Sequence, residues 1–290
     1  YSSAASDVYK RQESDGVRCA MKDSKFGYIN DKDEIVIPFV YEHAYPFKDN
    51  LALVCKDGLW GVIDNTGNIK APFMYDIIYP YSNDRACFST NDKFGYIDKN
   101  GVRVIDAFYD EAAPFSGTLA KVRKKDKWGY IDKFGNIIIP LKYADVHNCI
   151  DNLLVVNSGG KFDPRWGVTN GGKWYVLNEK GLEISKRYSL VTNYVDGFAK
   201  INIGGRYENN DCFMGGLWGV LDRNGIECVP LIYEEISNIM DGNFRVKKNS
   251  KYGVINTHGD IIIPIKYDFI SPLCYGETFA VCDGEKIYIK

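Results

Sequence analysis

Short apolar runs alternate with polar turns along the whole chain of 290 residues, and no segment has helical periodicity. The runs WGVID at 60–64 and NIIIP at 136–140 are typical, and each lies beside a turn with Asp or Asn at its first position and Gly at its fourth. This chemistry is typical of a type I turn closed by a left-handed residue. The pattern therefore predicts antiparallel hairpins throughout the chain.

The hairpins recur with a period of 34 residues. One aromatic residue, in most cases followed by Gly, marks each unit, and we call these positions the repeat anchors: Phe26, Trp60, Phe94, Trp128, Trp174, Trp218 and Tyr252. A further step of 34 residues reaches Lys286. Because periods of this length indicate a repeat architecture, we expect seven units and a partial eighth over residues 13–290.

The pattern of each unit predicts a small antiparallel meander of three strands. A tyrosine such as Tyr41, the repeat tyrosine, follows the third strand, and a fourth strand forms if the segment after it is extended. We expect the strand after the turn to end at a proline, since proline cannot donate to an interior ladder. These prolines are Pro38, Pro72, Pro140, Pro230 and Pro264.

The strands are apolar on both faces. In WGVID, Trp60 and Val62 point to one face while Gly61 and Ile63 point to the other. Sheets must therefore stack on sheets, with the glycine leaving room for a neighbour's ring. The predicted fold class is an all-β tandem repeat of about 34-residue units, arranged as a propeller-like ring or as an open β-solenoid.

The run KWGYIDKFGNIIIPLKY at 127–143, together with an F-x-x-x-L-A-x-V stretch in the same unit, resembles the WG-containing repeat of bacterial proteins. The resemblance covers residues 17–290. The chain departs from the pattern at Phe26, Phe94 and Tyr252, at Asp106 in place of proline, and in a degenerate fifth unit around Trp174. The resemblance implies an interaction array and supplies no catalytic residues.

Two adjacent units carry insertions in the hairpin before the anchor. Regular hairpins take nine residues from the first strand position to the anchor, whereas those before Trp174 and Trp218 take 21 and 20. We expect the insertions to emerge side by side. The interpretation that we favour for them is that they only lengthen two hairpins, with glycine pairs as turns. The alternative is that they form a binding face. Its candidate residues offer cations and rings to an acidic or extended polymer: Lys161, Phe162, Asp163, Trp166, Arg206, Tyr207 and Glu208.

Composition argues against two kinds of partner, a nucleic acid and a membrane. The net charge is −2, which offers no basic surface for a nucleic acid, and no apolar stretch reaches the length of a membrane helix. Eight cysteines without a C-x-x-C pair predict reduced thiols rather than a metal cage, which favours the cytoplasm.

The chain begins at Tyr1 and not at Met, so we expect its natural N-terminus to be missing, and the sequence does not decide whether a signal peptide stood there. Residues 1–12 have no apolar periodicity and resemble translated sequencing-adapter read-through. We expect them to be a non-native, disordered leader.

Catalysis finds no support in the sequence. His43, His147 and His258 have no metal-ligand spacing, and neither a nucleophile motif nor a phosphate-binding loop occurs. We therefore expect no enzyme, no metal and no cofactor. The leading hypothesis is a non-catalytic protein-interaction scaffold that presents the two long hairpins. A module that binds a glycan or the cell envelope is the alternative, and an enzyme with a site between repeats is the third.

Overall fold

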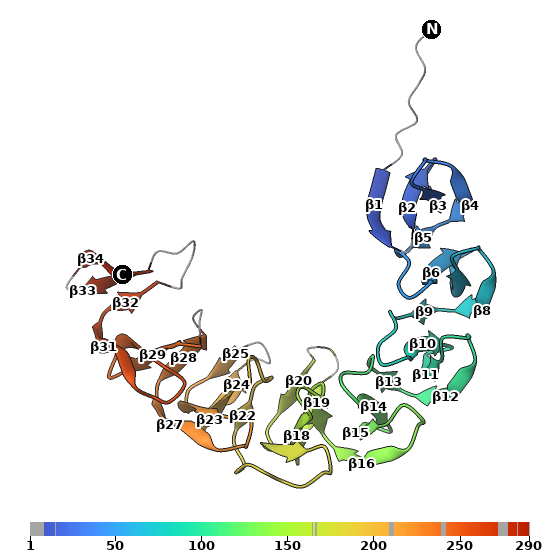
Figure 1. Ribbon diagram of the computed structural model, residues 1–290. Coiled ribbons are helices and arrows are strands. Elements are labelled where there is room, and N and C mark those ends of the chain that lie inside the picture. The colour runs from blue at the N-terminus through green and yellow to red at the C-terminus, as the bar shows by residue number, and fades with distance from the viewer. Residues whose placement is uncertain are drawn as a thin grey trace. The chain divides into compact units, whose positions relative to one another are not determined.

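The computed structural model describes residues 9–14, 16–163, 165, 167–208, 212–238, 242–271, 278–282 and 284–289. Throughout this described part the chain forms strands and turns and no helix. It divides into two compact units, residues 1–125 with 130–137 and residues 126–129 with 138–290. Figure 1 shows sheets that follow one another along the chain, each built from neighbouring strands, except that a pair of inserted strands interrupts the order in two of them. The predicted all-β tandem array of antiparallel sheets is confirmed.

The first four sheets each contain four antiparallel strands in chain order. They are β1 (Tyr9–Ser14), β2 (Val17–Lys22), β3 (Lys25–Asn30) and β4 (Ile35–Tyr41); β5 (His43–Ala44), β6 (Leu51–Lys56), β7 (Leu59–Asp64) and β8 (Ile69–Tyr75); β9 (Ile77–Ile78), β10 (Ala86–Thr90), β11 (Lys93–Ile97) and β12 (Arg103–Tyr109); and β13 (Glu111–Ala112), β14 (Ala120–Lys124), β15 (Lys127–Ile131) and β16 (Ile137–Tyr143).

The later sheets are less regular, because two contain insertions and the last has three strands. They are β17 (Asp145–Val146), β18 (Leu153–Ser158) and β21 (Lys173–Asn178), with β19 (Lys161–Asp163) and β20 (Val168–Asn170) inserted; β22 (Leu190–Val191), β23 (Ala199–Ile203), β26 (Leu217–Leu221) and β27 (Glu227–Tyr233), with β24 (Arg206–Glu208) and β25 (Cys212–Met214) inserted; β28 (Glu235–Asn238), β29 (Phe244–Lys248), β30 (Lys251–Ile255) and β31 (Ile261–Tyr267); and β32 (Phe269–Ile270), β33 (Thr278–Cys282) and β34 (Glu285–Ile289).

A regular sheet has four strands, and its first strand is only two residues long in most units. In the second sheet β5 pairs with β6 through His43 and Ala44, directly after the last strand of the preceding sheet. In the first sheet β1 takes this place and pairs with β2. Residues 9–12 of the expected leader therefore form part of a strand, while residues 1–8 lie outside the described residues.

The expectation that proline ends a strand is wrong. β4 runs from Ile35 through Pro38 to Tyr41. Between the pairs Phe26–Tyr41 and Tyr28–Ile37 the register shifts, so that Pro38 lies in a bulge of the outermost strand. A proline is tolerated there because a bulge on an edge strand needs no N–H from it.

The glycine beside most anchors makes room for this bulge, and in two units it also makes room for a ring of a neighbouring strand: a Cβ on Gly61 would stand 3.0 Å from the Phe73 ring, and one on Gly95 would stand 2.8 Å from the Phe88 ring. A Cβ built on Gly27 would stand 2.7 Å from the carbonyl oxygen of Ile37 and 2.9 Å from the carbonyl carbon of Pro38. Real Cβ atoms do not approach backbone so closely. Glycine is therefore required wherever the bulged fourth strand crosses the anchor strand.

Apolar cores form between successive sheets, as two-sided burial predicts. Val62 packs with the third sheet beside Ile78 and Phe88, whereas Ile63 packs with the first sheet beside Tyr28. Of the anchors, Trp128 and Trp174 are buried and the other five are half-buried. Tyrosines two residues after an anchor lie deeper: Tyr28, Tyr96 and Tyr130. The choice between a ring and an open solenoid stays a prediction.

Candidate functional site

Two inserted arms replace the tight hairpin turn in the fifth and sixth units. In a regular hairpin the pair Lys56–Leu59 closes over a two-residue turn. The corresponding pairs here, Ser158–Lys173 and Ile203–Leu217, enclose residues 159–172, the first arm, and residues 204–216, the second arm. Each arm holds a two-stranded sheet of its own, β19–β20 or β24–β25. Figure 1 shows both arms projecting from the same side of their sheets.

A buried asparagine fixes the base of each arm. Asn157 has no exposed side-chain surface, donates through Nδ2 to the carbonyl of Gly171 at 3.2 Å, and accepts through Oδ1 from the N–H of Gly160 at 3.1 Å. In the second arm Asn202 makes the equivalent bonds to Gly215 and Gly205, at 3.0 and 2.9 Å. Because the amide satisfies backbone groups of both strands, each arm leaves its sheet at a fixed bend.

Glycine pairs are required at this bend. Gly172 has a φ of +71°, and a Cβ on it would lie 2.3 Å from the nitrogen of Gly160 and 2.4 Å from the side-chain oxygen of Asn157. Gly216 stands in the same relation to Gly205 and Asn202. The two strands cross so closely here that only glycine fits. The matching sequence motifs of the two arms thus encode one shared backbone geometry.

The rings of both arms turn inward. The ring centroid of Phe162 lies 6.2 Å from that of Trp128, in an edge-to-face arrangement. In the second arm Tyr207 packs on Phe213 at 5.1 Å, and Phe213 packs on Trp218 at 5.6 Å. Such ring pairs stabilise by about 1 kcal/mol beyond the area they bury. Both arms therefore pack against repeat anchors, the first against Trp128 and the second against Trp218.

Asp145 contacts the first arm. Its carboxylate oxygen Oδ2 accepts a hydrogen bond from the hydroxyl of Thr169, in the first arm, at 2.7 Å. Burial raises the pKa of Tyr207, in the second arm, and the Asp145 carboxylate raises it further. One carboxylate thus contacts one arm and acts electrostatically on the other.

The outward-facing side chains are charged. Lys161 and Arg206 are exposed, and Arg206 lies 3.8 Å from Glu208. Asp163 pairs with Arg165 at 3.0 Å, and these hydrogen bonds hold the pKa of the Asp163 carboxyl below its usual value. Trp166, the remaining candidate, lies outside the described residues. The structure thus separates the candidates into outward charges and inward rings.

Sequence reasoning missed the residues that shape the arms. Asn157 and Asn202 stand at matching positions of the two insertions, but the match alone gives an asparagine no role. Asp145 belongs to a two-residue strand 24 positions before its partner Thr169, so no local pattern joins them. The one available signal was a polar residue at the end of an apolar strand run, where it can only be buried if it is hydrogen-bonded.

Three broader properties concern all the described residues. No group of three or more His, Cys, Asp or Glu side chains among them is placed to hold a metal ion. In the same part of the chain no helix is long and apolar enough to cross a membrane. Four of the cysteines are buried, namely Cys19, Cys55, Cys87 and Cys149.

Comparison with solved structures gives low sequence identities. A crystal structure of the eukaryotic initiation factor shares 9% identity, with 97% of this chain and 83% of that chain covered and a TM-score of 0.48. Hsv2p of Kluyveromyces lactis shares 14%, with 72% of each chain covered and a TM-score of 0.37. The Pan2 WD40 domain of Neurospora crassa shares 12%, with 83% and 85% covered and a TM-score of 0.34.

No curated protein sequence matches the chain. The family described as WG containing repeat matches residues 26–60, 60–94, 94–128, 128–162, 218–252 and 252–286. Each of these segments begins at an anchor and extends one repeat period, and together they cover more than half of the chain. The stretch that they leave out contains the fifth unit and most of both arms. By its repeats, the chain belongs to the WG containing repeat family.

Proposed function

We propose that this repeat protein is a non-catalytic interaction scaffold that holds a partner protein on its two inserted arms. The observation that carries the proposal is the shared construction of the arms. Asn157 and Asn202 are both fully buried and both bond the backbone of two strands at 2.9 to 3.2 Å. Because the bases of the arms are already fixed, they lose little conformational entropy when the arms bind.

The exposed charges favour a protein with acidic side chains. Lys161 and Arg206 occupy equivalent positions at the starts of β19 and β24, and both are exposed. Charged groups of this kind give orientation and association rate to a protein interface. Glu208, which is exposed two residues after Arg206, would pair with a cation of the same partner.

The rings argue for a protein over a sugar at this site. Stacking on a sugar requires an open aromatic face, but Phe162 packs against Trp128, and Tyr207 packs against Phe213. Both rings are half-buried. A glycan would therefore have to bind through the charged side chains alone.

The test removes the arms without altering the repeat. Replacing residues 159–172 and residues 204–216 each by Asp-Gly restores the two-residue turn found at Asp57–Gly58 and the regular nine-residue hairpin. A cross-linked pull-down from a lysate of the source cells then compares the intact and trimmed arrays. We expect a specific protein on the intact array only, and equal retention by both would overturn the proposal.

A second variant separates charge from folding. The double substitution Lys161→Glu and Arg206→Glu changes only exposed side chains and leaves the packed rings in place. We expect it to lose the same partner as the trimmed array, while a glycan array stays negative with all three proteins. Binding of a glycan that depends on the arms would contradict the choice of a protein partner.

A further inference from the structure

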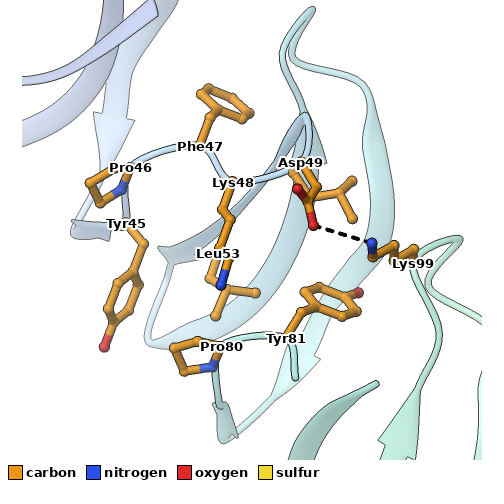
Figure 2. Close-up of a pocket in the computed structure, with 10 residues that line it drawn as sticks. Tyr45, Pro46, Phe47, Lys48, Asp49, Leu53, Pro80, Tyr81 and Lys99 are labelled. Atoms are coloured by element: carbon orange, nitrogen blue, oxygen red, sulfur yellow. Dashed lines mark hydrogen bonds and ion pairs between the residues drawn. The ribbon is translucent and has the colours of Figure 1, made fainter. Parts of the chain in front are cut away.

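A pocket of about 440 Å³ lies within the first compact unit, far along the sequence from the arms. Its walls come from residues 45–53, from Pro80 and Tyr81, and from Lys99. Figure 2 shows Tyr45 on one side, Tyr81 on the other, and the side chain of Lys48 extending between them. The pocket is therefore lined by rings and has a cation at its centre.

A second pocket, of about 280 Å³, shares Tyr45 with the first. It is lined by Phe26, His43, Ala44 and Trp60 besides Tyr45. The ring centroid of Tyr45 lies 5.7 Å from that of Trp60, and His43 stacks on the same indole at 6.1 Å. Tyr45 thus forms a ridge between two neighbouring aromatic slots.

The repeat does not require a tyrosine at this ridge. Tyr45 is 46% exposed, whereas Phe47 two residues later is buried against Tyr28 at 4.5 Å between ring centroids. One, two and three repeats further on, the position of Tyr45 is held by Tyr79, Ala113 and His147. Tyr45 packs on Trp60 and is still 46% exposed, so the rest of its ring is available to a ligand.

The pocket is lined by two lysines, and Lys99 is the one in ion pairs. The Asp49 carboxylate pairs with Lys99 at 3.2 Å, and Lys99 also pairs with Asp84 at 3.1 Å. The hydrogen bonds that Lys99 donates to Asp84 and Asp49 raise its pKa. Lys48 is exposed and lies between the two tyrosines (Figure 2). A ligand that places a negative charge beside Lys48 therefore complements the pocket.

We propose that the two slots bind a proline-rich segment of another protein, with an acidic residue beside Lys48. A polyproline II helix has three residues per turn and a rise of about 3.1 Å, so its prolines present regular ridges to adjacent aromatic slots. The helix is preformed and its ordering costs little entropy, which suits a shallow aromatic groove. This site goes beyond the function proposed for the arms and does not depend on it.

Fluorescence polarisation with labelled decapeptides tests the assignment. The probes contain two P-x-x-P turns followed by Glu, Ala or Lys, with a matched set in which Ala replaces every proline. We expect the Glu peptide to bind saturably and the proline-free peptide to bind at least about tenfold more weakly. Tyr45→Ala should weaken binding at least about tenfold, whereas Tyr79→Ala, one repeat along and outside both pockets, should change it less than about twofold.

A charge exchange makes the test independent of folding. Lys48→Glu alters an exposed side chain and should reverse the preference from the Glu peptide to the Lys peptide. Three results would overturn the proposal: no saturable binding of any probe, binding that neither Tyr45→Ala nor Lys48→Glu changes, or Tyr45-dependent binding of an oligosaccharide with no peptide bound.

Discussion

The carboxylate of Asp110 and the backbone N–H of Lys125 are joined by a hydrogen bond of 2.7 Å. Asp110 lies between the third and fourth sheets, and Lys125 lies in the hairpin turn of the fourth. The other oxygen of the carboxylate accepts from Lys93 Nζ, also at 2.7 Å. Glu42 and Gly58 repeat the relationship at 2.8 Å. Where an acidic residue follows the repeat tyrosine, as Glu42 and Asp110 do, its carboxylate therefore joins one sheet to the next.

This tie predicts a measurable stability loss. Asp110→Ala removes the acceptor of both bonds, and because hydrogen bonds to charged groups contribute roughly 1.5 to 3 kcal/mol and this carboxylate is partly exposed, we expect a loss of about 1 to 2 kcal/mol. Urea denaturation measures it. Asp106→Ala, an exposed carboxylate in β12, is the control and should stay within about 0.5 kcal/mol of the parent. Equal effects of the two substitutions would refute the role of the tie.

Acid should destabilise the array, because carboxylates stabilise it both in its turns, as Asp64 does, and between its sheets, as Asp110 does. The hydroxyl of Thr66 lowers the pKa of Asp64, and the ammonium of Lys93 lowers that of Asp110. Since their folded pKa values lie below the unfolded value of about 3.9, this stabilisation is complete above about pH 4 and is lost as the pH falls through the folded values. The melting temperature should therefore fall below about pH 4.

Asparagine provides the control for this pH dependence. Asn30 occupies the position of Asp64 in the first unit and accepts the same backbone N–H bonds, from Lys32 and Glu34. Asp64→Asn should therefore fold at neutral pH and show a shallower loss of melting temperature in acid. An unchanged acid profile in this variant would contradict the assignment of the effect to Asp64.

Burial separates two tryptophans that occupy the same repeat position. Trp128 is 4% exposed and packs on Phe162, whereas Trp60 is half-buried. Because truncating a buried tryptophan costs roughly 3 to 5 kcal/mol, Trp128→Ala should lose at least about 3 kcal/mol, and Trp60→Ala clearly less. Chemical denaturation of both variants checks the order. An unchanged melting temperature for Trp128→Ala would refute its place in the core.

The buried asparagines should control the order of the arms. Asn157→Ala leaves the N–H of Gly160 and the carbonyl of Gly171 without the amide, so we expect a loss of about 1 to 3 kcal/mol and faster amide hydrogen exchange within residues 159–172. Hydrogen-exchange mass spectrometry measures the arm directly. Asn68→Ala, at an exposed turn, is the matched control and should leave hydrogen exchange in the first arm unchanged. Faster exchange within the first arm in both variants would argue against a local role of Asn157.

The regular parts of the fold could be predicted from sequence because they repeat in register. Seven aromatic anchors fix the hairpins, because each is followed by a turn with Asp or Asn at its first position and, in six of the seven, Gly at its fourth. Continuous apolar runs fix the burial of Val62 and Ile63 on opposite faces. The first strand of each sheet was left open because a two-residue strand such as β5 has no periodicity of its own.

Other features depend on long-range backbone geometry and could not be predicted. Pro38 lies inside a strand because the bulge falls on a sheet edge, and pairing across strands decides that. The sequence identified the arms and their charges, but it gave Phe162 and Tyr207 the wrong direction. The hydrogen bonds of Asn157 fix a bend at the base of the first arm, and this bend places the ring of Phe162 against Trp128, 34 residues earlier. A local sequence pattern does not contain that information.

The interaction role of the arms is tested most directly by quantitative cross-linking pull-down with three proteins: the intact array, the array trimmed to Asp-Gly turns, and the Lys161→Glu, Arg206→Glu variant. We predict one set of proteins that the intact array captures and both altered arrays lose, with cross-links that map to residues 159–172 and 204–216. Retention of the same proteins by all three arrays, or cross-links confined to other residues, would contradict the assignment of the binding site to the arms.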